Sequence, residues 1–231
     1  MIKEAIILAG GLGTRLRDAV PDLPKCMAPV NGQPFIGYVI QHLKEQGVER
    51  FIFSLGYKHN YFNDYLLGEL HADQFELCIE EEPLGTGGAI QYATSLVKGE
   101  DVIVTNGDTL FNVDITALSK QHFSNQSHCT LSLKPMNNFE RYGVVEIDID
   151  ARIVSFKEKK YYKEGLINGG VYALNVASLL HKSLPQKFSF EKEYLEAYFT
   201  ERNFFATVQQ AYFIDIGIPE DYAKAARDLK K

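Results

Sequence analysis

Two aspartates that follow apolar runs are the side chains of this sequence best suited to metal chemistry. Asp108 comes directly after the apolar run 102–105, and Asp215 ends a second run that is followed closely by Gly217. Open α/β sheets bind ligands at the carboxyl ends of their strands, where we expect both carboxylates. Mg²⁺ prefers oxygen ligands and usually takes one or two protein carboxylates. Asp108 and Asp215 are therefore the predicted Mg²⁺ ligands, and a structural turn aspartate is the alternative for each.

A glycine-rich segment, Leu8-Ala9-Gly10-Gly11-Leu12-Gly13-Thr14-Arg15-Leu16, follows the first apolar run. Its glycines let backbone N–H groups approach an anion without interference from Cβ atoms. The dinucleotide-binding fingerprint fails at Leu16, where a small residue is required, and the Gly-Lys-Ser/Thr of the P-loop is absent. Arg15 and Lys25 supply positive charges suited to a nucleoside triphosphate. The alternative is a tight strand-to-helix turn with a surface arginine.

A second glycine cluster, residues 82–89, opens a predicted helix. The first turn of a helix has unpaired N–H groups, and small residues allow a ligand to approach them closely. The segment therefore predicts a ligand contact, with a helix-capping loop as the structural alternative.

Apolar runs and helical periodicity place these segments in an α/β fold. Strand-like runs near residues 5–8, 50–55, 75–80 and 102–105 alternate with helical patterns near 35–46, 61–67 and 88–96. This alternation predicts a Rossmann-like, mostly parallel mixed sheet with helices on both faces. Beyond about residue 118, short strands near 129–133, 144–149, 153–156 and 170–174 predict an antiparallel extension, followed by a strand at 212–216 and a helix at 220–229.

Length, composition and net charge indicate the number of domains and exclude some classes of partner. The 231 residues are 45% hydrophobic, and we expect one domain over 1–231, with parts at about 1–118 and 119–231. The net charge of −6 argues against nucleic acid or an anionic membrane as partner. No signal peptide or 18-residue apolar stretch is evident, so we expect a cytoplasmic protein.

The three cysteines, Cys26, Cys78 and Cys129, are far apart in the sequence. This spacing predicts neither a disulfide framework nor a CxxC metal site. Cys26 stands beside Lys25, which leaves a lowered thiol pKa as the alternative to a simple packing role.

The opening segment together with Leu23-Pro24-Lys25 resembles the signature of the sugar-1-phosphate nucleotidyltransferases. The resemblance implies that Arg15 grips the nucleotide phosphates, that Lys25 assists at the reacting phosphates and that Asp108 acts in catalysis as a metal ligand with Asp215. The implied nucleotide contacts are Leu8, Ala9, Gly10, Gly11, Gly13, Thr14 and Glu82, with Gly85, Thr86 and Gly87 at the base. Phe213 stands where the family often has tryptophan.

Three later segments, 141–143, 156–159 and 168–172, resemble the sugar-binding segments of that family, in the same order. The implied sugar-phosphate contacts are Tyr142, Gly143, Glu158, Lys159, Asn168 and Gly169. Glu158 and Asn168 can bond hydroxyls, and Lys159 can pair with a phosphate. The neighbouring lysines are expected to form a solvated charged hairpin.

Nearly the whole chain is most similar to the bacterial D-glycero-α-D-manno-heptose 1-phosphate guanylyltransferases. This resemblance implies transfer of a nucleotidyl group from GTP to heptose 1-phosphate with release of pyrophosphate. It also implies Mg²⁺ as cofactor and leaves a homo-oligomer open. The alternatives are mannose 1-phosphate with GTP, N-acetylmuramate 1-phosphate with UTP, or an inactive nucleotide-sugar-binding regulatory subunit. A metal-dependent glycosyltransferase shares the aspartates but is disfavoured by the glycine–arginine segment.

Overall fold

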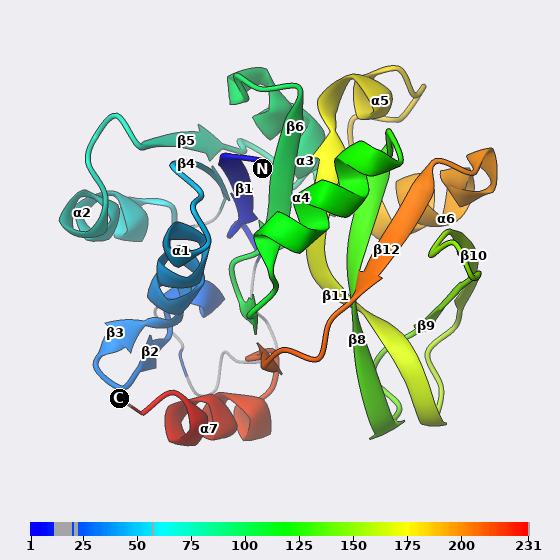
Figure 1. Ribbon diagram of the computed structural model, residues 1–231. Coiled ribbons are helices and arrows are strands. Elements are labelled where there is room, and N and C mark those ends of the chain that lie inside the picture. The colour runs from blue at the N-terminus through cyan, green and yellow to red at the C-terminus, as the bar shows by residue number, and fades with distance from the viewer. Residues whose placement is uncertain (12–19, 21–22, 57, 231) are drawn as a thin grey trace.

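A computed structural model describes residues 1–11, 20, 23–56 and 58–230. Within these residues the main sheet has nine strands, in the order β10-β9-β11-β6-β1-β4-β5, with β8 and β12 continuing from β11 (Figure 1). The pairs β7–β13 and β2–β3 form two small separate sheets. None of the described helices combines the length and the hydrophobicity that a bilayer-spanning segment needs.

The strands are β1 Glu4–Leu8, β2 Pro29–Val30, β3 Gln33–Pro34, β4 Arg50–Leu55, β5 Phe75–Ile79, β6 Asp101–Asn106, β7 Thr109–Phe111, β8 Cys129–Phe139, β9 Val144–Ile147, β10 Ile153–Lys157, β11 Tyr162–Asn175, β12 Phe204–Val208 and β13 Phe213–Asp215. The α-helices are α1 Phe35–Glu45, α2 Asn60–Glu69, α3 Gly85–Ala93, α4 Ile115–Ser124, α5 Val176–Leu180, α6 Glu196–Tyr198 and α7 Pro219–Asp228. Short 3₁₀-helices are η2 Lys25–Met27, η3 Thr94–Leu96 and η5 Phe199–Glu201, and η4, Phe190–Leu195, is a π-helix.

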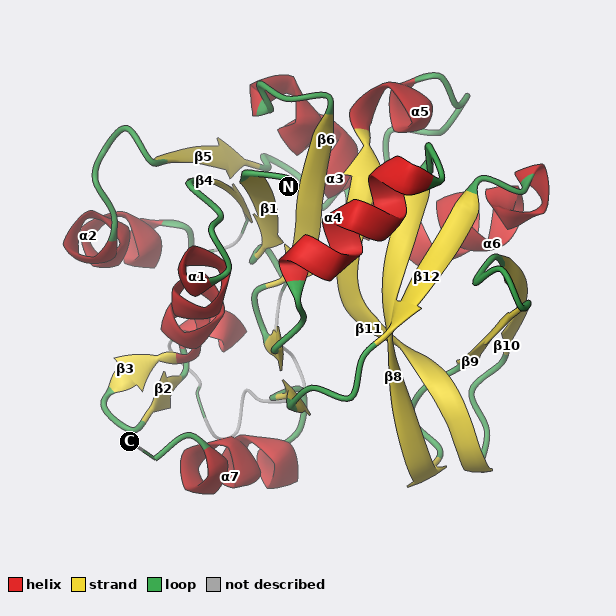
Figure 2. Cartoon of the chain, in the orientation of Figure 1, coloured by secondary structure: helices red, strands yellow, loops and turns green. Residues whose placement is uncertain are grey.

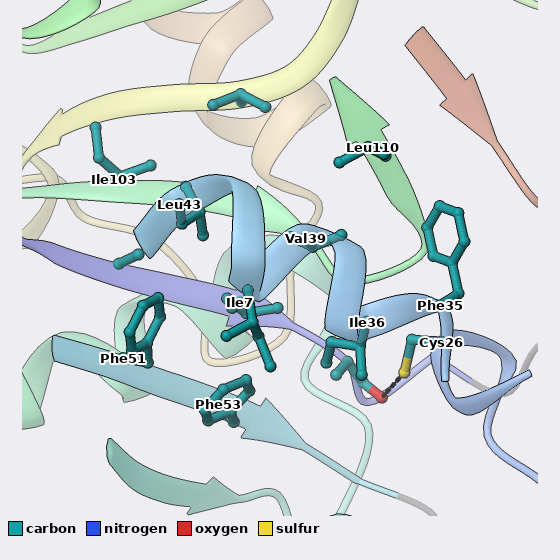
Figure 3. Packing of buried hydrophobic residues seen from close by; sticks show 14 of the residues in the cluster. Ile7, Cys26, Phe35, Ile36, Val39, Leu43, Phe51, Phe53, Ile103 and Leu110 are labelled. Carbon is teal, nitrogen blue, oxygen red and sulfur yellow. Dashed lines mark hydrogen bonds between the residues drawn. The ribbon is translucent and has the colours of Figure 1, made fainter. Parts of the chain in front are cut away.

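The parallel half of the sheet is built around β1, which pairs with β4 on one side and β6 on the other, and β5 follows β4. Successive side chains of a strand point to opposite faces, and Ile6 and Ile7 of β1 belong to two separate core clusters. Ile7 packs with α1, as Figure 3 shows, whereas Ile6 lies in the cluster that contains Ile90 of α3. Helices therefore cover both faces, and the sequence prediction is confirmed (Figure 2).

The second half of the sheet begins at β11, which pairs antiparallel with β6. β8 and β9 pair antiparallel with β11, and β10 pairs antiparallel with β9. This arrangement confirms the predicted antiparallel extension. β8 and β11 are longer than their predicted apolar runs, because they stay paired as far as Phe139 and Tyr162. β9 joins this outer part by pairing with β11 at Ile167, and β10 pairs with β9.

The sequence prediction lacks several elements of this half, namely α4, α5, η4, α6, η5 and β12. Two of these elements, α4 and β12, show why local patterns miss them. The helix α4 presents Ser119 and His122, as well as Ile115 and Leu118, to the interior, so its apolar periodicity is weak. The buried His122 ring instead hydrogen-bonds Thr130. The second element, β12, pairs parallel with β8, which lies far from it in the sequence. The short apolar run of β12 does not indicate this partner.

The last predicted strand forms, but outside the main sheet. β13 pairs antiparallel with β7, and Asp215 lies opposite Thr109. Because Thr109 directly follows Asp108, this pairing brings the two aspartates to the same edge of the molecule.

The glycine cluster of α3 packs against the chain near residue 188. The N–H of Gly87 donates to the carbonyl oxygen of Phe188 at 2.9 Å, and Phe188 N–H donates to the Leu84 carbonyl at 3.0 Å. A Cβ atom at Gly87 would overlap the Phe188 ring, and one at Gly88 would overlap the carbonyl oxygen of Gln186. These glycines therefore allow a late segment of the chain to cover the start of α3.

We expect Gly88→Ala to lower the free energy of unfolding by about 1–3 kcal/mol, since a backbone carbonyl cannot move aside as a side chain can. Gly68→Ala is the matched control, because Gly68 lies in α2 with open space around its Cβ position. There the substitution should be neutral or stabilising by up to about 1 kcal/mol. Urea unfolding of both variants measures the difference, and equal stabilities would contradict the packing described here.

Candidate active site

Two adjoining cavities open at the carboxyl ends of β1 and β6. The loop cavity, about 670 Å³, lies against the opening glycine segment and the start of α3. The strand cavity, about 390 Å³, lies against β9, β10 and β11. Both cavities are lined by Asn106, Thr109, Lys159, Glu191 and Asp215.

Most described residues of the predicted nucleotide set meet in the loop cavity. Its lining includes Leu8, Ala9, Gly10, Gly11, Lys25, Gly85, Thr86 and Asp108. Glu82 and Gly87 are not among the described residues that line either cavity. Their contacts with the nucleotide stay predictions. Gly13, Thr14 and Arg15 lie outside the described residues.

The structure brings the whole predicted sugar-phosphate set together in the strand cavity, which is lined by Tyr142, Gly143, Glu158, Lys159, Asn168 and Gly169. The β11 register shifts between Asn168 and Tyr172, where Gly170 has a φ of +73°. At this irregularity Asn168 Nδ2 donates to the Tyr172 hydroxyl at 2.9 Å, and Asn168 Oδ1 accepts from Gly170 N–H at 3.0 Å. Both contacts fix the amide against the cavity.

A lysine and two aspartates form a charged centre in the loop cavity, and one of the aspartates, Asp215, also lines the strand cavity. Lys25 Nζ, at the start of η2, donates to Asp108 Oδ2 at 2.6 Å and to Asp215 Oδ1 at 3.3 Å. Asp215 Oδ1 also accepts from Gly217 N–H at 2.8 Å. A Cβ at Gly217 would lie 3.1 Å from Lys25 Nζ, so the glycine leaves room for the ammonium group. The three charges come from segments as far as 190 residues apart.

Electrostatics keep this lysine charged. Burial by itself would lower the pKa of Lys25, but attraction to Asp108 and Asp215 outweighs burial and raises the pKa above its ordinary value of 10.5. The ammonium group is therefore protonated at neutral pH and partly neutralises the two carboxylates.

The donor set suits Mg²⁺. Asp108 and Asp215 are about one-third and 29% exposed and lie in the loop cavity, so their oxygens can reach a cation there. Among the described residues no group of three or more His, Cys, Asp or Glu side chains could hold a metal ion. Two carboxylates with phosphate and water oxygens are a usual Mg²⁺ arrangement, so the residues present fit the predicted cofactor.

Comparison with models of protein families shows to which family the chain belongs. The model described as "Nucleotidyl transferase" matches residues 4–231. The chain belongs to the nucleotidyl transferase family. Proteins named D-glycero-alpha-D-manno-heptose 1-phosphate guanylyltransferase are 49% identical in Aneurinibacillus thermoaerophilus, over 98% of both chains, and 44% identical in Campylobacter jejuni, over 95% of this chain and 96% of the relative.

Solved structures agree with this assignment. The crystal structure of HddC from Yersinia pseudotuberculosis complexed with GMP-PN has a TM-score of 0.86 and 38% identity, and the match covers 99% of this chain and 100% of that one. The nucleotidyl transferase family typically uses a divalent metal.

Several residues that line the cavities of this nucleotidyl transferase are functional candidates that sequence patterns missed. Asn106 and Thr109 lie within two residues of the predicted ligand Asp108, and this closeness is the one sequence signal that points to them. Glu80 accepts hydrogen bonds from Ser54 Oγ and Leu84 N–H, both at 3.0 Å, and no pattern around it indicated a ligand contact.

Cys26 has a packing role in this nucleotidyl transferase. Its side chain is buried in the core, and Sγ contacts the Ala9 carbonyl oxygen at 3.8 Å (Figure 3). Burial raises the pKa of the Cys26 thiol far above its ordinary value. The alternative of a lowered thiol pKa is therefore wrong, because desolvation outweighs the nearby Lys25 charge.

Lys25→Met should lower the free energy of unfolding by about 1–3 kcal/mol at pH 7, because the two aspartates would lose their shared cation. Folding raises the pKa of Lys25, so its stabilising contribution is complete below pH 10.5 and is lost as the pH rises through the raised value. The difference from wild type should therefore shrink above pH 10.5. Urea unfolding at pH 7 and pH 11 measures it, with Lys187→Met, at an exposed residue, as control. A pH-independent difference would contradict this account.

Proposed function

We propose that the protein transfers the guanylyl group of GTP to D-glycero-α-D-manno-heptose 1-phosphate, which gives GDP-heptose and pyrophosphate. The observation that carries this proposal is a pair of adjoining cavities that share Asp215 and Lys159 in their lining. Asp108 and Lys25 line the loop cavity, and Lys25 contacts both aspartates. The loop cavity receives the nucleotide and the strand cavity the sugar phosphate. Their shared wall is then the place where the two phosphates react.

The reaction needs little chemistry from side chains. A phosphate oxygen of the sugar substrate forms a bond to the α-phosphorus of GTP, and the bond from that phosphorus to the bridging oxygen of pyrophosphate breaks. Pyrophosphate leaves with the electron pair. The attacking phosphate is already anionic at neutral pH, so no general base is required. The protein has to align two polyanions and offset their charge.

The roles of the described residues follow from their positions and charges, and that of Arg15 from the family motif. Amide groups of Gly10 and Gly11 together with the Arg15 side chain bind the nucleotide phosphates, and Lys25 holds the two aspartates in place. Lys159 lines both cavities and binds the sugar phosphate. Mg²⁺ held by Asp108 and Asp215 supplies charge neutralisation when it is bound.

The choice of substrates rests on two arguments. The relatives at 44–49% identity carry the name of the heptose 1-phosphate guanylyltransferase. In addition, the Glu80 carboxylate lines the loop cavity and can accept hydrogen bonds from the adjacent N1–H and N2–H groups of guanine. Uracil offers only one such donor, so Glu80 favours GTP over UTP. GDP-heptose made in the cytoplasm would serve a capsule, S-layer glycan or lipopolysaccharide.

Asp108→Asn and Asp215→Asn should each lower kcat by about 100-fold or more while the protein stays folded. The measurement is pyrophosphate release, with GTP, UTP, CTP, dTTP and ATP each crossed with heptose, mannose and glucose 1-phosphates. Asp73→Asn, at an exposed carboxylate, is the control and should keep wild-type turnover. Wild-type turnover in both site variants would overturn the assigned roles, and no turnover by the wild-type protein would favour the regulatory-subunit alternative.

Removal of divalent cations should abolish pyrophosphate release, and added Mg²⁺ should restore it. Asp215→Asn should need several-fold more Mg²⁺ for half-maximal activity, since one of two protein ligands is lost. A titration of activity against Mg²⁺ after EDTA treatment measures both effects. Full activity in EDTA would show that no metal ion takes part.

A further inference from the structure

Glu191, at the start of the π-helix η4, lies in the wall that the two cavities share. Its Oε2 accepts two hydrogen bonds, from Thr86 Oγ1 at 2.8 Å and from Ser189 Oγ at 2.9 Å. In the described part of the chain, no donor forms a hydrogen bond or ion pair with the other oxygen, Oε1. One oxygen is therefore anchored, and the other is available in the cavities.

The anchoring groups are themselves fixed. Thr86 Oγ1 accepts from Phe190 N–H at 2.9 Å, so the Thr86 hydroxyl hydrogen is directed to Glu191. The Ser189 side chain accepts from Lys192 N–H at 3.3 Å and caps η4. These bonds join the start of α3 to η4 and hold the carboxylate in one orientation before a substrate binds.

A carboxylate in this position needs a donor partner. It repels the phosphates of both substrates, and a hydrogen bond donated to the carboxylate oxygen by a substrate group would offset this repulsion. The uncharged donors that the proposed substrates carry next to their reacting phosphates are hydroxyl groups.

We propose that Glu191 Oε1 accepts a hydrogen bond from a substrate hydroxyl, on the ribose of the nucleotide or on the ring of the sugar phosphate. This inference rests on the proposed function and makes Glu191 a specificity-determining residue. A site with a fixed acceptor discriminates strongly against a substrate that lacks the matching donor, because the acceptor is then left without a partner.

The test combines variants with substrates that lack single hydroxyls. Wild type and Glu191→Ala are assayed with GTP, 2′-deoxy-GTP and 3′-deoxy-GTP, and with heptose 1-phosphates that lack the hydroxyl at C2, C3 or C4. Removal of the partner hydroxyl should lower the wild-type kcat/KM by about 10- to 100-fold. Glu191→Ala should show a similar loss with the intact substrates and little further loss with that one analogue. The analogue that behaves in this way identifies ribose or sugar as the source.

Two further variants complete the experiment. In Glu191→Gln the amide oxygen can accept the hydrogen bonds from Thr86 and Ser189, which turns the NH2 group, a donor, toward the cavities. This variant therefore keeps the size of the side chain without the acceptor, and it should lose kcat/KM with the intact substrates as Glu191→Ala does. Glu193→Gln is the matched control, because Glu193 lies two residues further along η4 and, among the described lining residues, is part of neither cavity. Its carboxylate accepts from Ser189 N–H at 2.7 Å, and glutamine can keep that bond.

The possible results separate the two proposals. If the kcat/KM of Glu191→Ala falls by the same factor, relative to wild type, with the intact and with every deoxy substrate, or does not fall at all, the role of Glu191 is overturned while the proposed function stands. If the wild-type protein transfers no nucleotidyl group with any pair of substrates, both are overturned.

Discussion

The attraction of one lysine to two aspartates is the constraint on which the candidate site depends. Three charges from η2, the turn after β6 and the end of β13 converge where the two cavities meet. Without Lys25 the two carboxylates would face each other at an edge of the molecule that also has to receive phosphates. The raised pKa of Lys25 reflects the same energy, because the ammonium form is favoured by both partners in spite of its burial.

Each half of the sheet contributes a different part of this site. Parallel strands end at the loop cavity, which Gly10 and Gly11 line, and the antiparallel strands and their turns supply polar side chains of the strand cavity. The segment from Gln186 to Glu191 joins the halves, since it packs on the glycines of α3 and then enters the shared wall. Glycines that suggested contact with a ligand therefore also serve the contact between two parts of the chain.

Local patterns predicted β1, β4 and β6 well, because each is a short apolar run that is buried on both faces. They failed for α4, whose buried face includes the hydrogen-bonded His122, and for β12, which pairs with a distant strand. In the site, the predicted sugar-phosphate set and the described part of the glycine segment line the cavities, and their contacts with substrates stay predictions. Glu80 and Glu191 were given no role, since their positions depend on hydrogen bonds to Ser54 and Thr86 from other parts of the chain.

By itself the sequence determined which chemistry is available: flexible backbone at Gly10 and Gly11, carboxylates at the ends of apolar runs, and motifs that place the chain in its family. The tertiary structure decided which of these groups meet. Asp215 reaches Asp108 only because β13 pairs with β7 outside the main sheet, and Glu191 reaches both cavities only through the packing of η4 on α3. The reason is physical: residue type fixes what a side chain can do, whereas the distance between charges far apart in the chain depends on long-range pairing that no local pattern encodes.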